Sequence, residues 1–168
     1  FPVSVLLNDG NGNLGAPMQN TNVSGNEIAT GDVNGDGKID VFAGRFNSGA
    51  TLALGNGDGS FGAITFLSDV QANSAQLVDV TGDTKPDLVF TSGTLHGGTL
   101  DVRPGNGDGT FGADTSIAAG NNTALLIADL DGDSHPDAVA TGGTTGLTFF
   151  HGIPGGFGSG TDSTVPQI

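Results

Sequence analysis

Short apolar segments separated by polar, glycine-rich turns recur along the whole chain. The first complete set consists of Ile28 to Thr30, Ile39 to Ala43, Thr51 to Leu54 and Phe61 to Leu67. Asn56-Gly57, between the last two segments, is a dipeptide typical of tight turns because both residues tolerate positive φ. Segments of this length with turn residues on both sides predict β-strands.

The same set of four segments occurs twice more. In the second set the segments are Gln76 to Val80, Leu88 to Thr91, Thr99 to Arg103 and Phe111 to Ile117. In the third set they are Ala124 to Leu130, Ala138 to Thr141, Leu147 to His151 and Phe157 onward. The spacing from Phe61 to Phe111 is 50 residues, and a period of this size indicates tandem structural repeats.

A glycine-rich turn motif repeats in phase with these segments. It runs from Leu7 to Ala16, from Leu54 to Ala63 and from Pro104 to Ala113, with a shorter copy from Gly152 to Gly158. The first copy precedes the first complete set of segments. We therefore expect residues 1–26 to hold only the last two strands of a unit and a connector.

Several of the predicted strands are apolar throughout, as in Leu125 to Ala128. Such strands are typically buried on both faces, and a four-stranded antiparallel unit covered on both sides by its neighbours is a β-propeller blade. We predict an all-β fold, a β-propeller of four-stranded antiparallel blades, with about three and a half blades in this chain. The complete blades are expected at residues 27–75, 76–123 and 124–168. A β-solenoid and a β-sandwich are the alternative architectures.

Propellers close with roughly four to eight blades. We therefore expect the chain either to be part of a longer propeller or to form a homodimer that completes the ring. The chain opens at Phe1 without a Met or a leader, as a processed or trimmed segment does.

Composition and charge narrow the range of partners. The 168 residues include 31 Gly and 10 Phe but no Cys, Trp or Tyr, so disulfides and thiolate metal sites are excluded. The net charge of −14 opposes binding to nucleic acid or to an anionic membrane surface. No apolar run is long enough to insert into a membrane as a spanning helix.

Ten of the 18 acidic residues lie in three loops that follow the first strand of each unit, Asp32 to Asp40, Asp79 to Asp87 and Asp129 to Asp137. Oxygen-bearing side chains occupy positions one, three, five and nine of each loop, and position seven can supply its carbonyl oxygen. The expected ligands are Asp32, Asn34, Asp36, Lys38 and Asp40; Asp79, Thr81, Asp83, Lys85 and Asp87; and Asp129, Asp131, Asp133, His135 and Asp137. A short loop of hard oxygen ligands is typical of Ca²⁺. We predict up to three bound calcium ions.

Aspartates that cap backbone donors in ordinary hairpin turns are the alternative explanation of these loops. Three loops in register with the repeat favour the metal sites. Loop one has the fullest pattern, loop two carries Thr81 and Thr84 at positions three and six, and loop three carries Ser134 at position six. Loop two is therefore expected to bind metal most weakly.

These motifs together resemble the FG-GAP or VCBS repeats, which occur in the propellers of integrin α-subunits. Phe61-Gly62-Ala63 and Phe111-Gly112-Ala113 resemble the motif that gives the family its name, and Leu14-Gly15-Ala16-Pro17 is a variant. The acidic loops are similar to the family's calcium motif, except at Thr81, Thr84 and Ser134. The resemblance implies a calcium-binding β-propeller that is secreted or on the cell surface. It also implies adhesion or ligand binding, including lectin-like members that bind sugars between blades.

The loops at the opposite edge from the acidic loops contain the predicted ligand contacts. Arg45, Phe46, Asn47 and His96 are the candidates, since polar connectors around them suit a glycan or protein ligand. Plain solvated loops explain the same residues equally well.

Catalytic residues are not evident. The chain has neither a Cys nucleophile nor a Gly-x-Ser-x-Gly elbow, and Asp69, Asp101 and Asp114 are the remaining candidates for a carboxylate pair. We predict a non-catalytic, calcium-stabilised extracellular module that binds glycan or protein ligands. A structural spacer of a larger secreted protein and an accessory domain of a polysaccharide-degrading enzyme are the alternatives.

Overall fold

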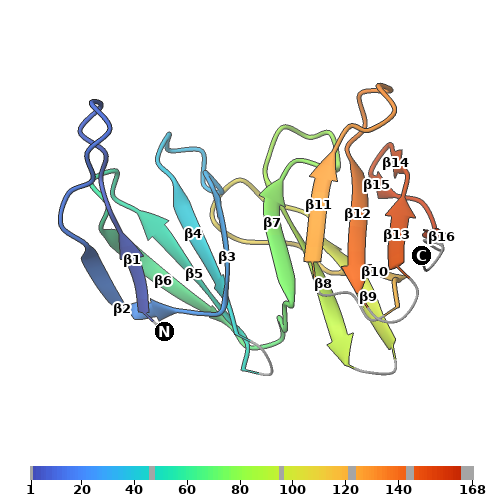
Figure 1. Cartoon of the computed structure of the whole chain (residues 1–168), viewed down its shortest axis with the longest axis horizontal. Coiled ribbons are helices and arrows are strands. Elements are labelled where there is room, and N and C mark those ends of the chain that lie inside the picture. Colours follow the sequence, from blue (N-terminus) through green and yellow to red (C-terminus); the bar gives the residue numbers. More distant parts are fainter. Residues whose placement is uncertain (1, 46–47, 95–96, 121–123, 143–145, 164–168) are drawn as a thin grey trace.

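The computed structural model describes residues 2–45, 48–94, 97–120, 124–142 and 146–163. Over these ranges the chain forms strands and turns without a helix, so the predicted all-β class is confirmed. The strands form three four-stranded antiparallel sheets, as predicted, together with two smaller hairpins (Figure 1). No helix within the described ranges is long and apolar enough to cross a membrane.

Each four-stranded sheet is built from one repeat in chain order. Sheet one contains β3 (Glu27–Gly31), β4 (Asp40–Gly44), β5 (Ala50–Gly55) and β6 (Phe61–Leu67). Sheet two contains β7 (Ser74–Val78), β8 (Asp87–Thr94), β9 (Gly97–Arg103) and β10 (Thr115–Ala118). Sheet three contains β11 (Ala124–Ala128), β12 (Asp137–Gly142), β13 (Gly146–Phe150) and β16 (Thr161–Ser163). Neighbouring strands in each sheet are therefore neighbours in sequence, with β14 and β15 as an inserted hairpin.

One of the two smaller hairpins precedes sheet one, and the other lies between β13 and β16 of sheet three. β1 (Pro2–Val5) pairs with β2 (Met18–Ser24), as expected for the last two strands of a unit. β14 (Gly152–Ile153) pairs with β15 (Gly156–Phe157).

The three sheets pack face to face and bury an apolar core between each pair. Phe42 and Leu52 of sheet one pack with Leu88 and Phe90 of sheet two in one cluster. A second cluster joins the other face of sheet two to sheet three and is centred on Phe150. Inner strands are consequently buried on both faces, and every residue of β4 is buried. This is the burial that the continuous apolar character of the strands predicted.

The described sheets stand in an open row, and they do not close into a ring (Figure 1). The four-stranded repeat unit is thus confirmed, whereas closure of a propeller stays a prediction. Within the described part of the chain, no sheet packs on the outer face of sheet three, where Leu126 is 56% exposed and Phe149 is 38% exposed.

The last strand of the second and third sheets is shorter than the sequence predicted. Phe111 makes only an isolated bridge to Gly105, and β10 begins at Thr115. Phe157 belongs to the β14–β15 hairpin, and β16 begins at Thr161. In the third repeat the difference follows from Gly155 and Gly156, which both have positive φ and turn the chain.

Candidate functional site

The acidic loops are folded by the aspartate at position one. In loop one, Asp32 Oδ1 accepts hydrogen bonds from the backbone N–H groups of Gly35 and Asp36, and Asp32 Oδ2 accepts one from Gly37. Asp79 and Asp129 accept corresponding bonds in loops two and three. The connections β3–β4, β7–β8 and β11–β12 that carry the loops lie along one edge of the molecule (Figure 1).

The aspartate at position nine anchors each loop to its sheet. Asp40 and Asp87 are fully buried, and Asp137 is 5% exposed. Asp87 Oδ2 accepts hydrogen bonds of 2.8 and 2.9 Å from the N–H groups of Val80 and Thr81. Its Oδ1 accepts one of 2.9 Å from Gly105, at the end of the third strand. Much of this loop is therefore held by the backbone capping that was the alternative to a metal site.

The same anchor holds loops one and three. Asp40 accepts bonds from Val33 and Gly55, and Asp137 accepts bonds of 2.8 Å from Leu130 and 2.7 Å from Gly152. The N–H of Gly152, followed by that of Leu130, holds the pKa of Asp137 below its usual value. Asp137 is thus kept ionised, and both of its oxygens are bonded to the backbone.

The departures from the loop motif at position six leave the backbone path unchanged. Gly37, Thr84 and Ser134 all adopt the left-handed conformation, with φ of 79°, 70° and 73°. An L-residue in this conformation is strained. Thr84 and Ser134 therefore maintain the loop shape at some cost in stability.

In loops one and two, a lysine ammonium pairs with the position-five aspartate. Lys38 Nζ lies 3.3 Å from Asp36 Oδ2, and Lys85 Nζ lies 3.4 Å from Asp83 Oδ2. The backbone N–H groups of the same lysines are the main reason why the pKa values of Asp36 and Asp83 are lowered.

Loop three gathers its carboxylates most closely. Oxygens of Asp129, Asp131 and Asp133 all lie within 4.8 Å of one another, and a second such group consists of Asp131, Asp137 and His151. Within the described parts of the chain, these are the groups of acidic and histidine side chains that are close enough to share a metal ion. Their hard oxygens are the donor set that Ca²⁺ prefers.

His151 is a site residue that the sequence analysis did not assign to the loop. It follows β13 and occupies the position that Leu54 and Pro104 hold in the other two repeats. Aligning the repeats at this position was the signal that could have identified it.

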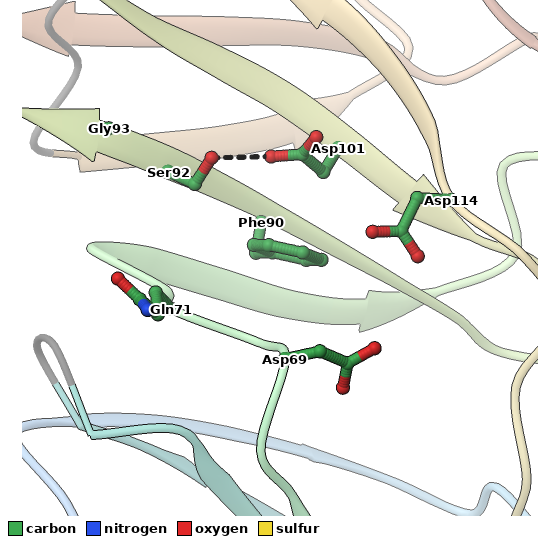
Figure 2. A pocket seen from close by; sticks show the side chains of 7 residues that line it. All are labelled: Asp69, Gln71, Phe90, Ser92, Gly93, Asp101 and Asp114. Carbon is green, nitrogen blue, oxygen red and sulfur yellow. Dashed lines mark hydrogen bonds between the residues drawn. The ribbon is translucent and has the colours of Figure 1, made fainter.

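A second candidate site is an open pocket of about 300 Å³ on the face of sheet two that looks toward sheet one. Asp69 and Gln71 enter it from the segment between β6 and β7, and Asp114 enters from the residue before β10. Figure 2 shows these side chains around the ring of Phe90, with Asp101 and Ser92 along one side. The pocket brings together the three aspartates that the sequence left as the remaining carboxylates.

Asp101 is the best-satisfied acid of the pocket. It is 5% exposed, and its Oδ2 accepts hydrogen bonds of 2.7 Å from the hydroxyls of Ser92 and Thr99. Its Oδ1 accepts a bond of 2.5 Å from the hydroxyl of Ser116. Three neutral donors thus hold one buried negative charge.

Arg103 forms ion pairs with the other two acids of the pocket. Its buried guanidinium donates hydrogen bonds of 2.8 Å to Asp69 and 3.0 Å to Asp114. The bond from Arg103 is the main reason why the pKa of Asp69 lies below its usual value. Three carboxylates therefore line the pocket, and one guanidinium pairs with two of them.

Arg45, the predicted ligand contact that lies within the described residues, does not line this pocket. Arg45 Nε donates a 2.9 Å hydrogen bond to the carbonyl of Ser24, so it connects β2 to the β4–β5 turn. Phe46, Asn47 and His96 lie outside the described residues. The prediction for those three stays untested.

A solved structure with a similar fold is that of an Agrocybe aegerita lectin that specifically recognises non-reducing terminal N-acetylglucosamine. It is 24% identical, with a TM-score of 0.65, and the match covers 94% of this chain and 46% of the lectin chain. The chain therefore spans about half the length of that lectin, and the likeness shows the fold. No protein of curated function matches the sequence significantly.

The family assignment comes from the sequence motifs. The model of the FG-GAP-like repeat matches residues 32–90 and 79–140, which include all three acidic loops and the pocket strands β8 and β9. The chain belongs to the family of FG-GAP-like repeat proteins.

Proposed function

We propose that this chain is a calcium-stabilised, non-catalytic binding module for neutral glycans, with the sugar in the pocket between sheets one and two. The observation that carries the proposal is the convergence of Asp69, Gln71, Ser92, Asp101 and Asp114 in one open pocket. Pockets with a few convergent polar groups on a rigid scaffold are typical ligand sites.

The chemistry of the pocket suits a polyol. The remaining lone pair of Asp101 Oδ1 and the oxygens of exposed Asp69 can accept hydrogen bonds from sugar hydroxyls, and the Gln71 amide both donates and accepts. The larger hollow of about 570 Å³ beside Leu7, Ile39 and Phe61 is a less suitable sugar site, because most of its lining side chains are apolar.

The charge of the pocket selects among glycans. Three carboxylates against one guanidinium leave an excess of negative charge, which repels sialylated or sulfated sugars. Neutral sugars carry no such penalty. The structurally similar lectin recognises N-acetylglucosamine, a neutral sugar, which supports the same class of ligand here.

The same electrostatics argue against glycoside hydrolysis. A glycosidase needs one carboxylic acid with a raised pKa to protonate the leaving group. Arg103 has the opposite effect on Asp69, whose pKa is lowered. Binding is therefore the better supported use of these aspartates.

Calcium and an extracellular location complete the proposal. The gathered oxygens of loop three support binding of Ca²⁺ there, and loops one and two share its backbone geometry. Exposed sites of this kind bind calcium at about 10⁻⁴–10⁻³ M in extracellular modules, so they fill where calcium is abundant.

Glycan-array binding followed by calorimetry with N-acetylglucosamine-terminated oligosaccharides tests the sugar site. We expect binding to neutral glycans, and a loss of about ten- to a hundredfold in affinity for Asp101→Asn, because a hydrogen bond to a charged group contributes roughly 1.5–3 kcal/mol. Gln71→Ala, at an exposed position, should weaken binding without affecting folding.

Asp162→Asn is the matched control, because exposed Asp162 also accepts a threonine hydroxyl but lies in sheet three. Its affinity should equal that of the unmodified chain. A folded protein that binds no neutral glycan, or binds one equally well after Gln71→Ala and Asp101→Asn, would exclude this pocket.

A further inference from the structure

We infer that loop three is a site for a borderline divalent transition metal, such as Zn²⁺ or Co²⁺, with His151 as its nitrogen ligand. This inference rests on the proposed metal-binding role of the loop, but it is independent of sugar binding. It concerns which metal the loop selects.

His151 reaches the loop from a different part of sheet three. Its Nδ1 lies 3.3 Å from Asp131 Oδ2 and 3.3 Å from Asp137 Oδ1. Its Nε2 lies 3.9 Å from Asp133 Oδ2. The imidazole therefore meets carboxylates from positions three, five and nine of the same loop.

The separations match those in a tetrahedral metal site. Zn–N and Zn–O bonds of roughly 2.0–2.1 Å place two ligand atoms of a tetrahedron about 3.3–3.4 Å apart. The two distances from His151 Nδ1 have this value already. One metal ion can thus replace the direct contacts with little movement of the side chains.

The ligand types favour a borderline metal at this position. Imidazole nitrogen suits Zn²⁺, Co²⁺ and Ni²⁺, whereas Ca²⁺ takes oxygen ligands. Two carboxylates, from Asp131 and Asp137, balance the charge of a divalent ion, and Asp133 or a water completes the coordination.

Asp137 is also held in place for this role. Its two oxygens accept the backbone N–H groups of Leu130 and Gly152, and Gly152 directly follows His151 in sequence. Supporting hydrogen bonds of this kind orient metal ligands and raise affinity.

Loops one and two lack this arrangement. Leu54 and Pro104 stand at the position of His151, and neither offers a ligand atom from its side chain. Lys38 and Lys85 place an ammonium beside the position-five carboxylate, and a metal ion at that carboxylate must displace this contact. Loop three has His135 in place of these lysines.

Zn²⁺ calorimetry on the whole chain, after removal of metals by chelation, tests the inference. We expect one Zn²⁺ bound per chain, and a loss of at least tenfold in affinity for His151→Leu, which places in loop three the residue found at position 54. Co²⁺ should give the absorption bands of a tetrahedral site, and the imidazole NMR signals of His151 should shift on binding.

His135→Asn is the control, because it removes the other imidazole of loop three without adding a charge and leaves His151 intact. It should retain the cobalt absorption and the His151 shift. Unchanged Zn²⁺ affinity in His151→Leu, or a His151 signal that does not respond to zinc, would overturn the inference.

A parallel Ca²⁺ titration separates this inference from the proposed function. Calcium binding without zinc binding rejects the transition-metal site and leaves the calcium proposal intact. Zinc binding without calcium binding supports the transition-metal site and rejects the calcium proposal.

Discussion

Loops one and three share a backbone conformation but differ in the side chains that surround their carboxylates. In both, the position-one aspartate folds the loop and the buried position-nine aspartate ties it to the next strands. Loop one then neutralises Asp36 with Lys38, whereas loop three brings Asp131, Asp133 and Asp137 beside His151. The repeat therefore preserves the residues that shape the loop and varies those that decide which cation it holds.

The largest loss of stability is expected from substitution of the position-nine aspartate. This loss should be the same whether or not the loop holds a metal ion. Asp87→Ala leaves the buried N–H groups of Val80 and Gly105 and the half-buried N–H of Thr81 without their acceptor, at about 1–3 kcal/mol for each unsatisfied group. We expect the free energy of unfolding in urea to fall by roughly 3–5 kcal/mol in chelator.

Asp83→Ala is the control for this prediction, because Asp83 is exposed and lies at position five of the same loop. It should leave the free energy of unfolding nearly unchanged, because an exposed ion pair contributes little. Equal losses for the two variants would show that position nine is no anchor.

The loops should contribute unequally to the stabilisation of the fold by calcium. A ligand that binds only the folded state stabilises it by about 2.7 kcal/mol at a hundredfold excess over Kd, so chelation should lower Tm. Asp133→Ala should remove more of the calcium-dependent rise in Tm than Asp83→Ala, because loop three gathers its oxygens and loop two carries Lys85. A Tm that is unaffected by both calcium and chelator would reject the metal sites.

The smallest change in stability is expected at position six, where the loops differ in sequence but have the same backbone conformation. Thr84→Gly removes the strain of a threonine at φ 70°, which costs about 1–2 kcal/mol, against an entropic cost of about 0.5–1 kcal/mol for glycine. We expect stability to rise by up to about 1 kcal/mol in chemical denaturation.

Gly37→Ala is the reverse experiment at the equivalent position of loop one. An added Cβ there meets no atom within 4 Å, so any loss of stability reports the left-handed backbone alone. A loss of about 1 kcal/mol is expected, and unchanged stability in both variants would contradict strain at position six.

The sequence by itself determined the all-β class, the four-stranded repeat and the placement of the acidic loops. These features depend on local patterns: apolar runs, turn residues and aspartates at fixed spacing. Strand ends were less predictable. Phe111 and Phe157 look like strand residues in the repeat, but pairing across the sheet decides where β10 and β16 begin.

The tertiary structure alone decided which of these residues meet. Asp69 and Arg103 are distant in sequence, and they form an ion pair because sheets one and two pack face to face. His151 approaches loop three because the third strand of each sheet ends beside the loop between the first two. Local patterns contain no information on the Asp69–Arg103 pair, since it arises from how whole sheets pack, whereas aligning the repeats could have placed His151 at the end of its strand.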